Sequence, residues 1–467
     1  MNSIKRSTLF LSALFGISLA LLAQGSKKLL KAEAWITNPD KSVLFEKQNL
    51  PPKDAETSDE IVVDAGTTYQ PIDGFGYTLT GGSALHIYNM GSEARKKILE
   101  KLFSAENGIG VSYLRLSIGA SDLDELVFSY NDLPDGETDP ELKNFSLGYD
   151  QKYLIPVLKE ILLINPEIKL MGSPWSPPKW MKTNKSPIGG SLLPEYYNSY
   201  ALYFVKYIEA YKAEGITIDA ITVQNEPLHP GNNPSLFMPA EQQAEFIKNH
   251  LGPAFQQHNI NTKIIIYDHN ADRTDYPITV LNDTSARKYI DGSSFHLYGG
   301  HVNDISKVHE AHPDKNLYFT EQWIGAPANF GGDLAWHIEH LIIGATRNWC
   351  RNVLEWNLAA DENQKPHTDQ GGCTRCLGAL TITGDEVIFN PAYYIIAHAS
   401  KFVRPGSVRI GSNTGNRLPN VAFKTPNGKF VLIVLNKDSS DVAFTVKTSD
   451  GQFTALLNPG AVGTYVW

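Results

Sequence analysis

The chain has little cysteine, no excess of positive charge and no repeated or low-complexity tract. Its 467 residues include three cysteines and carry a formal net charge of −9. This charge argues against nucleic acid or an anionic membrane surface as the main partner, because both attract clustered basic side chains. Neutral sugars stay compatible as ligands, and 42% hydrophobic residues allow a substantial core.

Long apolar runs are scarce as well. The one long run, at residues 9–23, follows Lys5 and Arg6 and precedes small polar residues. This is the layout of a secretory signal peptide, and the run is short for a stable membrane-spanning helix. We expect cleavage after Ala23, export to the periplasm, cell surface or medium, and no membrane span in the mature chain. A retained N-terminal anchor is the alternative.

The three cysteines lie late in the chain. Cys373 and Cys376 stand in a glycine-rich loop, which in an exported protein favours a small disulfide across that loop. A zinc site would need two more ligands at finger-like spacing, and the neighbouring sequence lacks them. A redox motif should open a helix of a thioredoxin-like unit, which this context does not offer. We expect Cys350 to be a buried apolar residue.

The middle of the chain alternates short apolar runs with helical patterns. Strands are predicted at residues 75–76, 111–118, 169–172, 219–223, 263–267, 293–297, 317–320 and 352–356, and the helices between them include 195–213, 240–257 and 334–348. Continuous runs of β-branched and aromatic residues are typical of parallel strands buried on both faces. About eight such units close a (β/α)8 TIM barrel of the α/β class.

Both ends of the chain show short strands in place of this alternation. After a predicted helix at residues 392–403, strands are expected at 421–424, 430–435, 442–447, 453–457 and 464–466. The N-terminal pieces at 42–45 and 61–63 are too few to bury a face alone, so we expect them to pair with the C-terminal strands. The predicted domains are a signal peptide at 1–23, N-terminal strands of a β-sandwich at 24–69, a catalytic barrel at 70–402 and the rest of the sandwich at 403–467.

Two glutamates, Glu226 and Glu321, each close a predicted buried strand, the fourth and the seventh of the barrel. Barrel enzymes carry their chemistry at the carboxyl ends of the strands, so the fold would make these two carboxyl groups face each other. Paired carboxyl groups suit glycoside hydrolysis, with one as general acid and base and the other as nucleophile. A single glutamate at a strand end is more often a solvated residue or the partner of an arginine.

The motif Asn225-Glu226-Pro227, together with SPWSPPKWMKTN at residues 173–184, resembles glycoside hydrolase family 30. That family includes lysosomal glucosylceramidases and bacterial and fungal β-1,6-glucanases. The likeness runs from about residue 74 to residue 402. It implies a barrel joined to a β-sandwich and a retaining, double-displacement hydrolase of β-glucosides that uses neither metal nor cofactor. Glu226 matches the acid/base, Glu321 the nucleophile and Asn225 the contact to the sugar 2-hydroxyl.

The resemblance also implies how the sugar in the −1 subsite is held. Asp122 corresponds to an acid that binds its hydroxyls, Trp175 and Trp356 match stacking positions, and His296 and Tyr298 lie near the nucleophile. In addition, Trp323 follows a strand end, where an exposed aromatic face can stack on a pyranose.

Arg115 lies in a predicted buried strand, where an unpaired charge would be costly. We expect it to pair with Glu321 and to keep that carboxylate ionised, with a structural ion pair to another acid as the alternative. The ionised Glu321 should in turn raise the pKa of Glu226.

The segment Asp268-His269-Asn270 follows the fifth predicted strand. Its ligand spacing is poor for a metal, so we interpret Asp268 and His269 as facing the substrate or supporting residues that do. By resemblance, this segment and the His-x-Tyr-Gly-Gly turn at 296–300 favour the β-1,6-glucanase branch. We therefore expect cleavage of β-1,6-glucan, internally for preference. A glucosylceramidase-like exo β-glucosidase and a non-catalytic sugar-binding barrel are the alternatives, and the sequence leaves the oligomeric state open.

Overall fold

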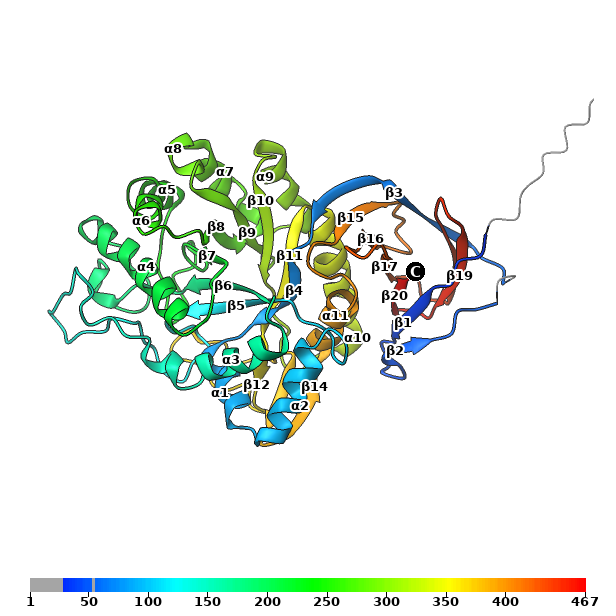
Figure 1. Ribbon diagram of the computed structural model, residues 1–467, viewed down its shortest axis with the longest axis horizontal. Coiled ribbons are helices and arrows are strands. Elements are labelled where there is room, and N and C mark those ends of the chain that lie inside the picture. The colour runs from blue at the N-terminus through cyan, green and yellow to red at the C-terminus, as the bar shows by residue number, and fades with distance from the viewer. Residues whose placement is uncertain (1–27, 53–54) are drawn as a thin grey trace, which may run out of the picture.

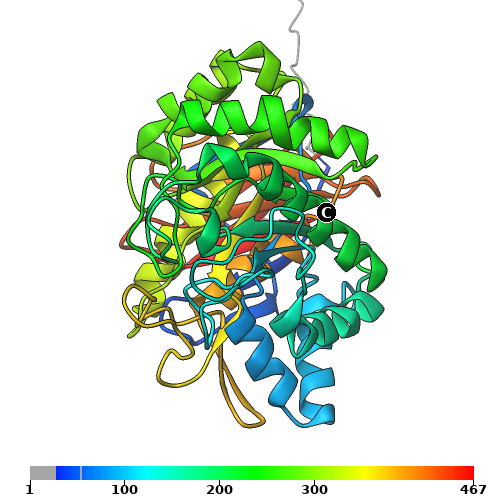
Figure 2. The same cartoon turned by 90° about the vertical axis from the view of Figure 1, so that its left-hand side faces the viewer.

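The computed structural model describes residues 28–52 and 55–467. The expected signal peptide at residues 1–23 lies outside these ranges. Figure 1 shows a barrel surrounded by helices beside a β-sheet domain, and Figure 2 shows the barrel in front with the C-terminal strands behind it. Within the described ranges, no helix has the length and apolar character needed to cross a membrane.

Eight parallel strands close the barrel in the order β10-β11-β4-β5-β6-β7-β8-β9. They are β4 (Gly74–Thr78), β5 (Tyr113–Ile118), β6 (Lys169–Pro174), β7 (Ala220–Thr222), β8 (Lys263–Asn270), β9 (Ile290–His296), β10 (Asn316–Glu321) and β11 (Cys350–Asn357). The predicted α/β barrel is confirmed. Glu226 follows its fourth strand, β7, and Glu321 ends its seventh, β10.

The inside of the barrel changes from apolar to polar along the strands. Near the amino ends of the strands, a separate buried cluster consists of Tyr113, Met171, Ala220, Ile265, Tyr318 and Leu354. Side chains two positions apart lie on the same face of a strand. The next inward layer on five of these strands is therefore Arg115, Ser173, Thr222, Thr320 and Trp356. This polar layer forms the floor of the carboxyl end of the barrel.

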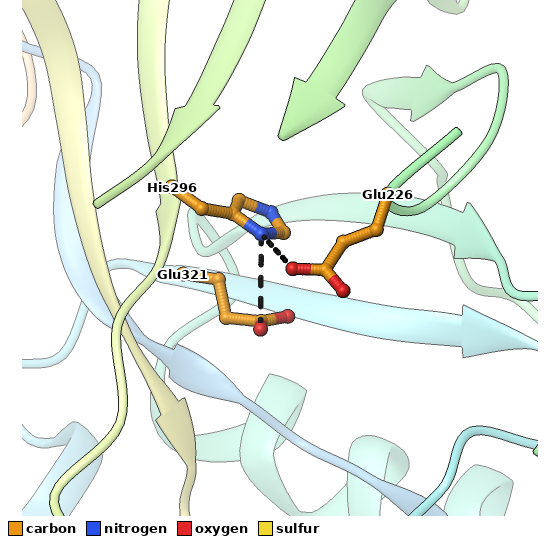
Figure 3. A group of neighbouring side chains, drawn as sticks. All are labelled: Glu226, His296 and Glu321. Atoms are coloured by element: carbon orange, nitrogen blue, oxygen red, sulfur yellow. Dashed lines mark hydrogen bonds and ion pairs between the residues drawn. The ribbon is translucent and has the colours of Figure 1, made fainter. Parts of the chain in front are cut away.

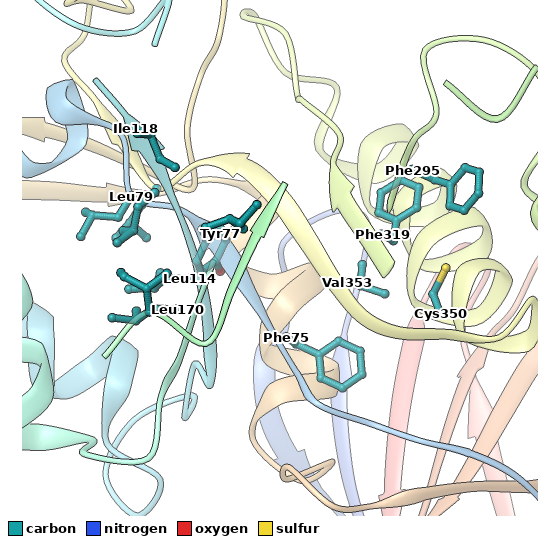
Figure 4. Packing of buried hydrophobic residues seen from close by; sticks show 14 of the residues in the cluster. Phe75, Tyr77, Leu79, Leu114, Ile118, Leu170, Phe295, Phe319, Cys350 and Val353 are labelled. Atoms are coloured by element: carbon teal, nitrogen blue, oxygen red, sulfur yellow. The ribbon is translucent and has the colours of Figure 1, made fainter. Parts of the chain in front are cut away.

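The opposite faces of the strands pack against the surrounding helices. The contact between strands and helices forms a second, larger hydrophobic cluster, part of which Figure 4 shows. The strands contribute Leu114, Leu170, Phe319 and Val353 to it. The helices are α1 (Gly81–Asn89), α2 (Ser92–Phe103), α3 (Leu154–Ile164), α4 (Tyr197–Ala213), α5 (Ala240–Phe246), α6 (Gly252–Gln257), α7 (Asp275–Asn282), α8 (Thr284–Arg287), α9 (Ser306–Ala311), α10 (Phe330–His337) and α11 (Pro391–Ser400).

Helix α4 shows why these segments are helical. Tyr200, Tyr203, Tyr207 and Tyr211 recur every three or four residues and are all buried, which is the spacing of one helix face. The expected helix at 240–257 is interrupted by a π-helical turn at Ile247–Leu251 before α6. Pro253 lies at the start of α6, and because proline lacks an amide donor it removes one bond of the regular ladder.

The second domain is a nine-stranded sheet in the order β19-β18-β3-β15-β16-β17-β20-β1-β2. Its strands are β1 (Glu33–Thr37), β2 (Leu44–Gln48), β3 (Asp59–Pro71), β15 (Val408–Ser412), β16 (Asn420–Lys424), β17 (Phe430–Leu435), β18 (Val442–Lys447), β19 (Gln452–Leu457) and β20 (Val462–Val466). Strand β1 pairs with β20, and β3 pairs with β15 and β18. The expected sandwich built from both chain ends is confirmed.

Three parts of the architecture were not expected. Strands β1 and β15 are absent from the sequence-based assignment, and so is a small sheet of β12 (Ala359–Ala360), β13 (Leu380–Thr383) and β14 (Glu386–Phe389). β15 contains an arginine and a glycine in five residues, a weak strand pattern that its neighbours β3 and β16 stabilise. Local propensity alone does not reveal such strands.

Candidate active site

Glu226 and Glu321 face each other at the carboxyl end of the barrel. Three atoms lie within 4.8 Å of one another: one carboxylate oxygen of Glu226, one of Glu321 and Nδ1 of His296. Figure 3 shows this imidazole nitrogen facing both carboxyl groups. Glycosidases that retain configuration hold their two carboxyl groups about 5 Å apart, whereas inverting enzymes leave room for a water molecule. The observed spacing is that of a retaining enzyme.

Both glutamates line a cavity of ≈ 410 Å³, called the active-site cavity below. Its lining residues are Asp122, Trp175, Glu226, His229, Asn232, His269, Asn270, Tyr298, Glu321, Trp323, Trp356, Cys373 and Cys376. A larger cavity of ≈ 590 Å³ lies at the opposite end of the barrel, around Tyr113, Lys169 and Asp219. Barrel enzymes do not carry their chemistry at that end.

Backbone hydrogen bonds hold the segment after β7 between its two neighbouring strands. The Asn225 amide donates to the carbonyl of Pro174 at the end of β6, and the Glu226 amide donates to the carbonyl of Asp268 on β8. Glu226 has a φ of 44°, in the left-handed region that non-glycine residues rarely adopt. Such backbone strain is common at functional sites, where the surrounding structure holds it in place.

Arg115 lies beneath the two glutamates, fully buried on β5. Its Nη1 donates to Oε2 of Glu321 at 2.6 Å, and its Nη2 donates to Oδ2 of Asp268 at 2.8 Å and to Oδ1 of Asn225 at 2.6 Å. The expected pair with Glu321 and the alternative pair with another acid are both present. A guanidinium can serve several acceptors at once because it carries five donors in a rigid fork.

Asp268 takes the supporting one of its two expected roles, because it does not line the active-site cavity. Its side chain has 0% exposure, and it accepts hydrogen bonds from Arg115, His296 and the hydroxyl of Thr320. The physical cause is an irregularity in β8, where Tyr267 and Asp268 both have positive φ and the register shifts. Such a bulge turns one side chain inward out of sequence, so Asp268 orients Arg115 and His296 from below.

His296, the last residue of β9, connects three carboxyl groups. Its Nδ1 lies 3.1 Å from Oε1 of Glu226 and 3.8 Å from Oε1 of Glu321, and its Nε2 lies 3.3 Å from Oδ1 of Asp268. Burial lowers the pKa of His296, but the charge of Glu321 and the hydrogen bonds to Asp268 and Glu226 outweigh it and raise the pKa to about 9. The imidazole is therefore protonated at neutral pH and donates from both nitrogens.

The expected direction of the Glu226 pKa is wrong. Burial raises it, but the hydrogen bond and charge of His296 outweigh burial, so the pKa is lowered. Burial raises the pKa of Glu321 despite the opposing charges of His296 and Arg115. Two carboxyl groups and one imidazole thus titrate as a unit. Residue order does not place His296 beside Glu226, and the sequence therefore predicted a raised pKa for Glu226.

A histidine whose pKa is raised stabilises the fold below its unfolded pKa. For His296 this contribution is fully present below pH 6.5 and is lost as the pH rises through about 9. We expect the difference in unfolding free energy between the wild type and His296→Gln to shrink over this range by on the order of 3 kcal/mol. Urea unfolding of both proteins at several pH values measures this difference in unfolding free energy. His258→Gln, at the far end of the barrel, is the matched control, and a difference for His296→Gln that stays constant with pH would contradict the assignment.

The remaining predicted sugar contacts line the active-site cavity. Burial, and then the charges of Glu321 and Glu226, raise the pKa of Asp122 to about 8, so that it is protonated at neutral pH and can donate to a sugar hydroxyl. Trp175 and Trp356 lie 5.4 Å apart between ring centroids at a tilt of 34°. Trp323 lines the same wall. Trp175 and Trp356 are only 1% and 4% exposed, whereas Trp323 is half-buried and offers the larger apolar surface to a pyranose ring.

Tyr298 and Asn225 also adjoin the catalytic pair. The hydroxyl of Tyr298 donates to Oε1 of Glu321 at 2.9 Å. Asn225 is buried, and its Oδ1 accepts a hydrogen bond from Arg115. Its contact with a sugar 2-hydroxyl stays a prediction.

Cys373 and Cys376 form a disulfide in the cavity wall, and the amide of Cys373 donates to Oδ2 of Asp122. Cys350 is buried and unpaired.

Two cavity residues, His229 and Asn232, were not predicted from the sequence. Both lie in the loop after β7, and Nδ2 of Asn232 donates to Oε2 of Glu226 at 3.2 Å. Asn270 also lines the cavity, although only its segment had been noted. A usable signal was the presence of His229, Asn232 and Asn233 a few residues after the catalytic Asn-Glu-Pro, since loops at the carboxyl ends of barrel strands carry function.

The trio Glu226, His296 and Glu321 has the atom types and spacing of a metal site. Its protonation works against this use, because a protonated imidazole has no lone pair to offer a metal. Both nitrogens of His296 already face carboxylate oxygens. The donor set fits a hydrogen-bonded acid cluster better than a metal centre.

Comparison with known protein families agrees with this geometry. The Glycosyl hydrolase family 30 TIM-barrel domain matches residues 72–403, and the Glycosyl hydrolase family 30 beta sandwich domain matches residues 406–465. The chain belongs to glycoside hydrolase family 30. The resemblance found in the sequence is thereby confirmed, and a non-catalytic barrel is the less fitting alternative because both family carboxyl groups are in place.

Relatives of this family 30 chain cover most of its length. The endo-1,6-β-D-glucanase neg1 of Aspergillus fumigatus is 32% identical over 473 residues, which is 94% of this chain and 95% of the relative. The lysosomal acid glucosylceramidase of Mus musculus is 30% identical over 426 residues, 85% of this chain and 81% of the relative. The solved structure of the endo-β1,6-glucanase BT3312 superposes with a TM-score of 0.87 at 34% identity, covering 93% of this chain and 99% of that one.

Proposed function

We propose that this family 30 hydrolase cleaves β-1,6-glucan with retention of configuration, internally for preference. The observation that carries the proposal is the pair Glu226 and Glu321, with carboxylate oxygens within 4.8 Å of each other in a cavity with tryptophans in its wall. Full-length similarity to endo-1,6-β-glucanases supports the linkage.

In the proposed mechanism Glu321 attacks the anomeric carbon while Glu226 protonates the glycosidic oxygen. The carboxylate of Glu321 is held for attack by Nη1 of Arg115 on one oxygen and by the hydroxyl of Tyr298 on the other. In the second step Glu226 takes a proton from water, which releases the sugar from Glu321. His296 lies within hydrogen-bonding distance of Glu226. It passes its proton to Glu226 before the first step and takes one back after the second.

The shape of the cavity supports a bent substrate. Thr368, in the loop between β12 and β13, donates its amide to the carbonyl of Asp122 and its hydroxyl to the carbonyl of Asn233. This loop thereby connects the segments after β5 and β7, and its Cys373 and Cys376 line the cavity. A 1,6-linkage has an extra rotatable bond, so its chain curls and can enter a walled cavity that a straight chain would not enter.

The product profile from β-1,6-glucan tests this proposal. We expect oligosaccharides of several lengths early in the reaction, followed by shorter ones, because internal attack cuts the polymer at many places. Glucosylceramide and an aryl β-glucoside are assayed beside it. Glucose as the sole early product would indicate an exo enzyme, and turnover of the lipid without any action on the glucan would contradict the proposal.

A single terminal glucose is the second candidate substrate. The similarity to the mouse glucosylceramidase favours it, and the −1 residues Asp122, Trp175 and Trp356 would serve a glucosyl group in either substrate. The two candidates differ in the leaving group, a sugar chain in one and a lipid in the other. The measurement above separates them.

We also propose that the chain is exported. The charged start and the apolar run at residues 9–23 support this, as does a disulfide between Cys373 and Cys376, because disulfides persist in oxidising compartments. Fractionation of cells that express the full chain, followed by N-terminal sequencing of the mature protein, tests the proposal. A mature chain that starts after residue 23 is the expected result.

A further inference from the structure

Four polar side chains from the segments after β7 and at the end of β8 lie on one side of the active-site cavity. His229 and Asn232 lie in the loop after β7, and His269 and Asn270 end β8. All four line the active-site cavity, and β7 and β8 are neighbouring strands. The residues expected to hold the −1 sugar, Asp122, Trp175 and Trp356, come from the segments after β5 and β6 and from β11. The two sets occupy different parts of the barrel rim.

Two of these residues lie close to the acid, and a third has an amide group that is unpaired within the described ranges. Nδ2 of Asn232 donates to Oε2 of Glu226 at 3.2 Å, and Nε2 of His269 lies 3.9 Å from Oε1 of the same glutamate. Burial lowers the pKa of His269 to about 4, so its ring is neutral at working pH. Oδ1 of Asn270 accepts from the amide of Tyr298, and among the described residues its Nδ2 has no hydrogen-bond acceptor.

We propose that His229, Asn232, His269 and Asn270 form the subsite for the leaving group, and that this leaving group is a hydroxylated sugar. The general acid must touch the glycosidic oxygen, so the first atoms of the leaving group lie against whatever surrounds Glu226 on its open side. On the side formed by the segments after β7 and at the end of β8, these four side chains line the cavity. The inference rests on the proposed function and extends it from the bond that is cut to the group that departs.

The chemistry of this subsite separates the two candidate substrates. Amide and imidazole groups both donate and accept, as sugar hydroxyls do, so each can pair with a hydroxyl of the departing glucose. An alkyl chain would bury the same groups without partners, which is unfavourable. Sites built for hydroxyl groups reject analogues that lack them more strongly than apolar pockets discriminate between apolar groups. The subsite therefore favours glucan over a sphingolipid.

Single variants test the subsite through a ratio of two activities. His229→Ala and Asn270→Ala are compared with the wild type on a β-1,6-gluco-oligosaccharide and on 2,4-dinitrophenyl β-glucoside, whose leaving group has no sugar hydroxyls. We expect the ratio of the two kcat/KM values to fall about tenfold, which corresponds to one hydrogen bond. His258→Ala, at the opposite end of the barrel, should keep the wild-type ratio. Equal loss on both substrates, or no loss, would overturn the proposal.

Transfer to added acceptors gives an independent readout. An acceptor enters the leaving-group subsite and reacts with the glycosyl enzyme by the reverse of its formation. With 2,4-dinitrophenyl β-glucoside as donor, we expect the wild type to transfer glucose to gentiobiose in preference to a long-chain alcohol, and Asn270→Ala to lose this preference. Preference for the alcohol would overturn the subsite. A wild type that transfers to gentiobiose but does not degrade β-1,6-glucan would contradict the proposed function and leave the subsite standing.

Discussion

Glu321→Gly should abolish hydrolysis, by roughly four to six orders of magnitude in kcat, yet produce a glucosyl azide of inverted configuration when azide is added. The glycine leaves a space where the nucleophile stood, and azide can attack from that side while Glu226 still protonates the leaving oxygen. Nuclear magnetic resonance of the azide product gives its anomeric configuration.

The companion variant Glu226→Ala serves as the control for these roles. With an activated aryl glucoside the first step needs no acid, so Glu321 still forms the glycosyl enzyme, and azide then gives the retained product. This test has particular weight here, because the pKa of Glu226 is lowered and that of Glu321 is raised. Taken alone, those pKa shifts would make Glu321 the acid/base and Glu226 the nucleophile. Inverted product from Glu226→Ala and retained product from Glu321→Gly would show that they are reversed.

Arg115→Met should be the most damaging change outside the two glutamates. It removes the buried cation from between Asp268 and Glu321, to which it donates at 2.8 and 2.6 Å. Removing one partner of a buried ion pair typically costs about 3–5 kcal/mol, because the other charge stays buried. We expect a loss of that size in the unfolding free energy, measured by urea denaturation.

The same variant should alter the pH dependence of activity. Arg115 lowers the pKa of Glu321 against the effect of burial, so its removal raises that pKa further. A nucleophile must be ionised to attack, and the acid limb of kcat/KM should therefore move to higher pH. Arg417→Met is the matched control, because Arg417 also bridges two acids, Asp59 and Asp438, but on the surface. It should cost about 1 kcal/mol or less. A similar small cost for Arg115→Met, with an unmoved acid limb, would contradict this role.

The barrel could be predicted from the sequence because each of its strands is buried on both faces. Runs such as residues 264–267 and 317–319 are continuously apolar or aromatic, and they lie within β8 and β10. The positions of Glu226 and Glu321 followed from strand order alone. By contrast, β1 and β15 are strands mainly because they pair with β20, β3 and β16, and such long-range pairing leaves little trace in local composition.

Two features of the site could not be read from residue order. Positive φ at Tyr267 and Asp268 turns Asp268 into the barrel, whereas regular alternation left open whether it faced the substrate. The position of His296, 3.1 Å from Glu226, depends on how β9 lies between β8 and β10. Because of that contact the pKa of Glu226 is lowered, whereas the sequence predicted that it would be raised. Titration depends on distances of a few ångströms, which sequence spacing does not supply.

The central claim, a double displacement through Glu321, is tested most directly by trapping the intermediate. A 2-deoxy-2-fluoro-β-glucosyl fluoride reacts slowly at the anomeric carbon but has a good leaving group, so the glycosyl enzyme accumulates. We expect one added 2-fluoroglucosyl group per chain, and peptide mass spectrometry should place it on Glu321 at the end of β10. A label on Glu226 or any other residue, or hydrolysis of the reagent without a trapped intermediate, would contradict the mechanism.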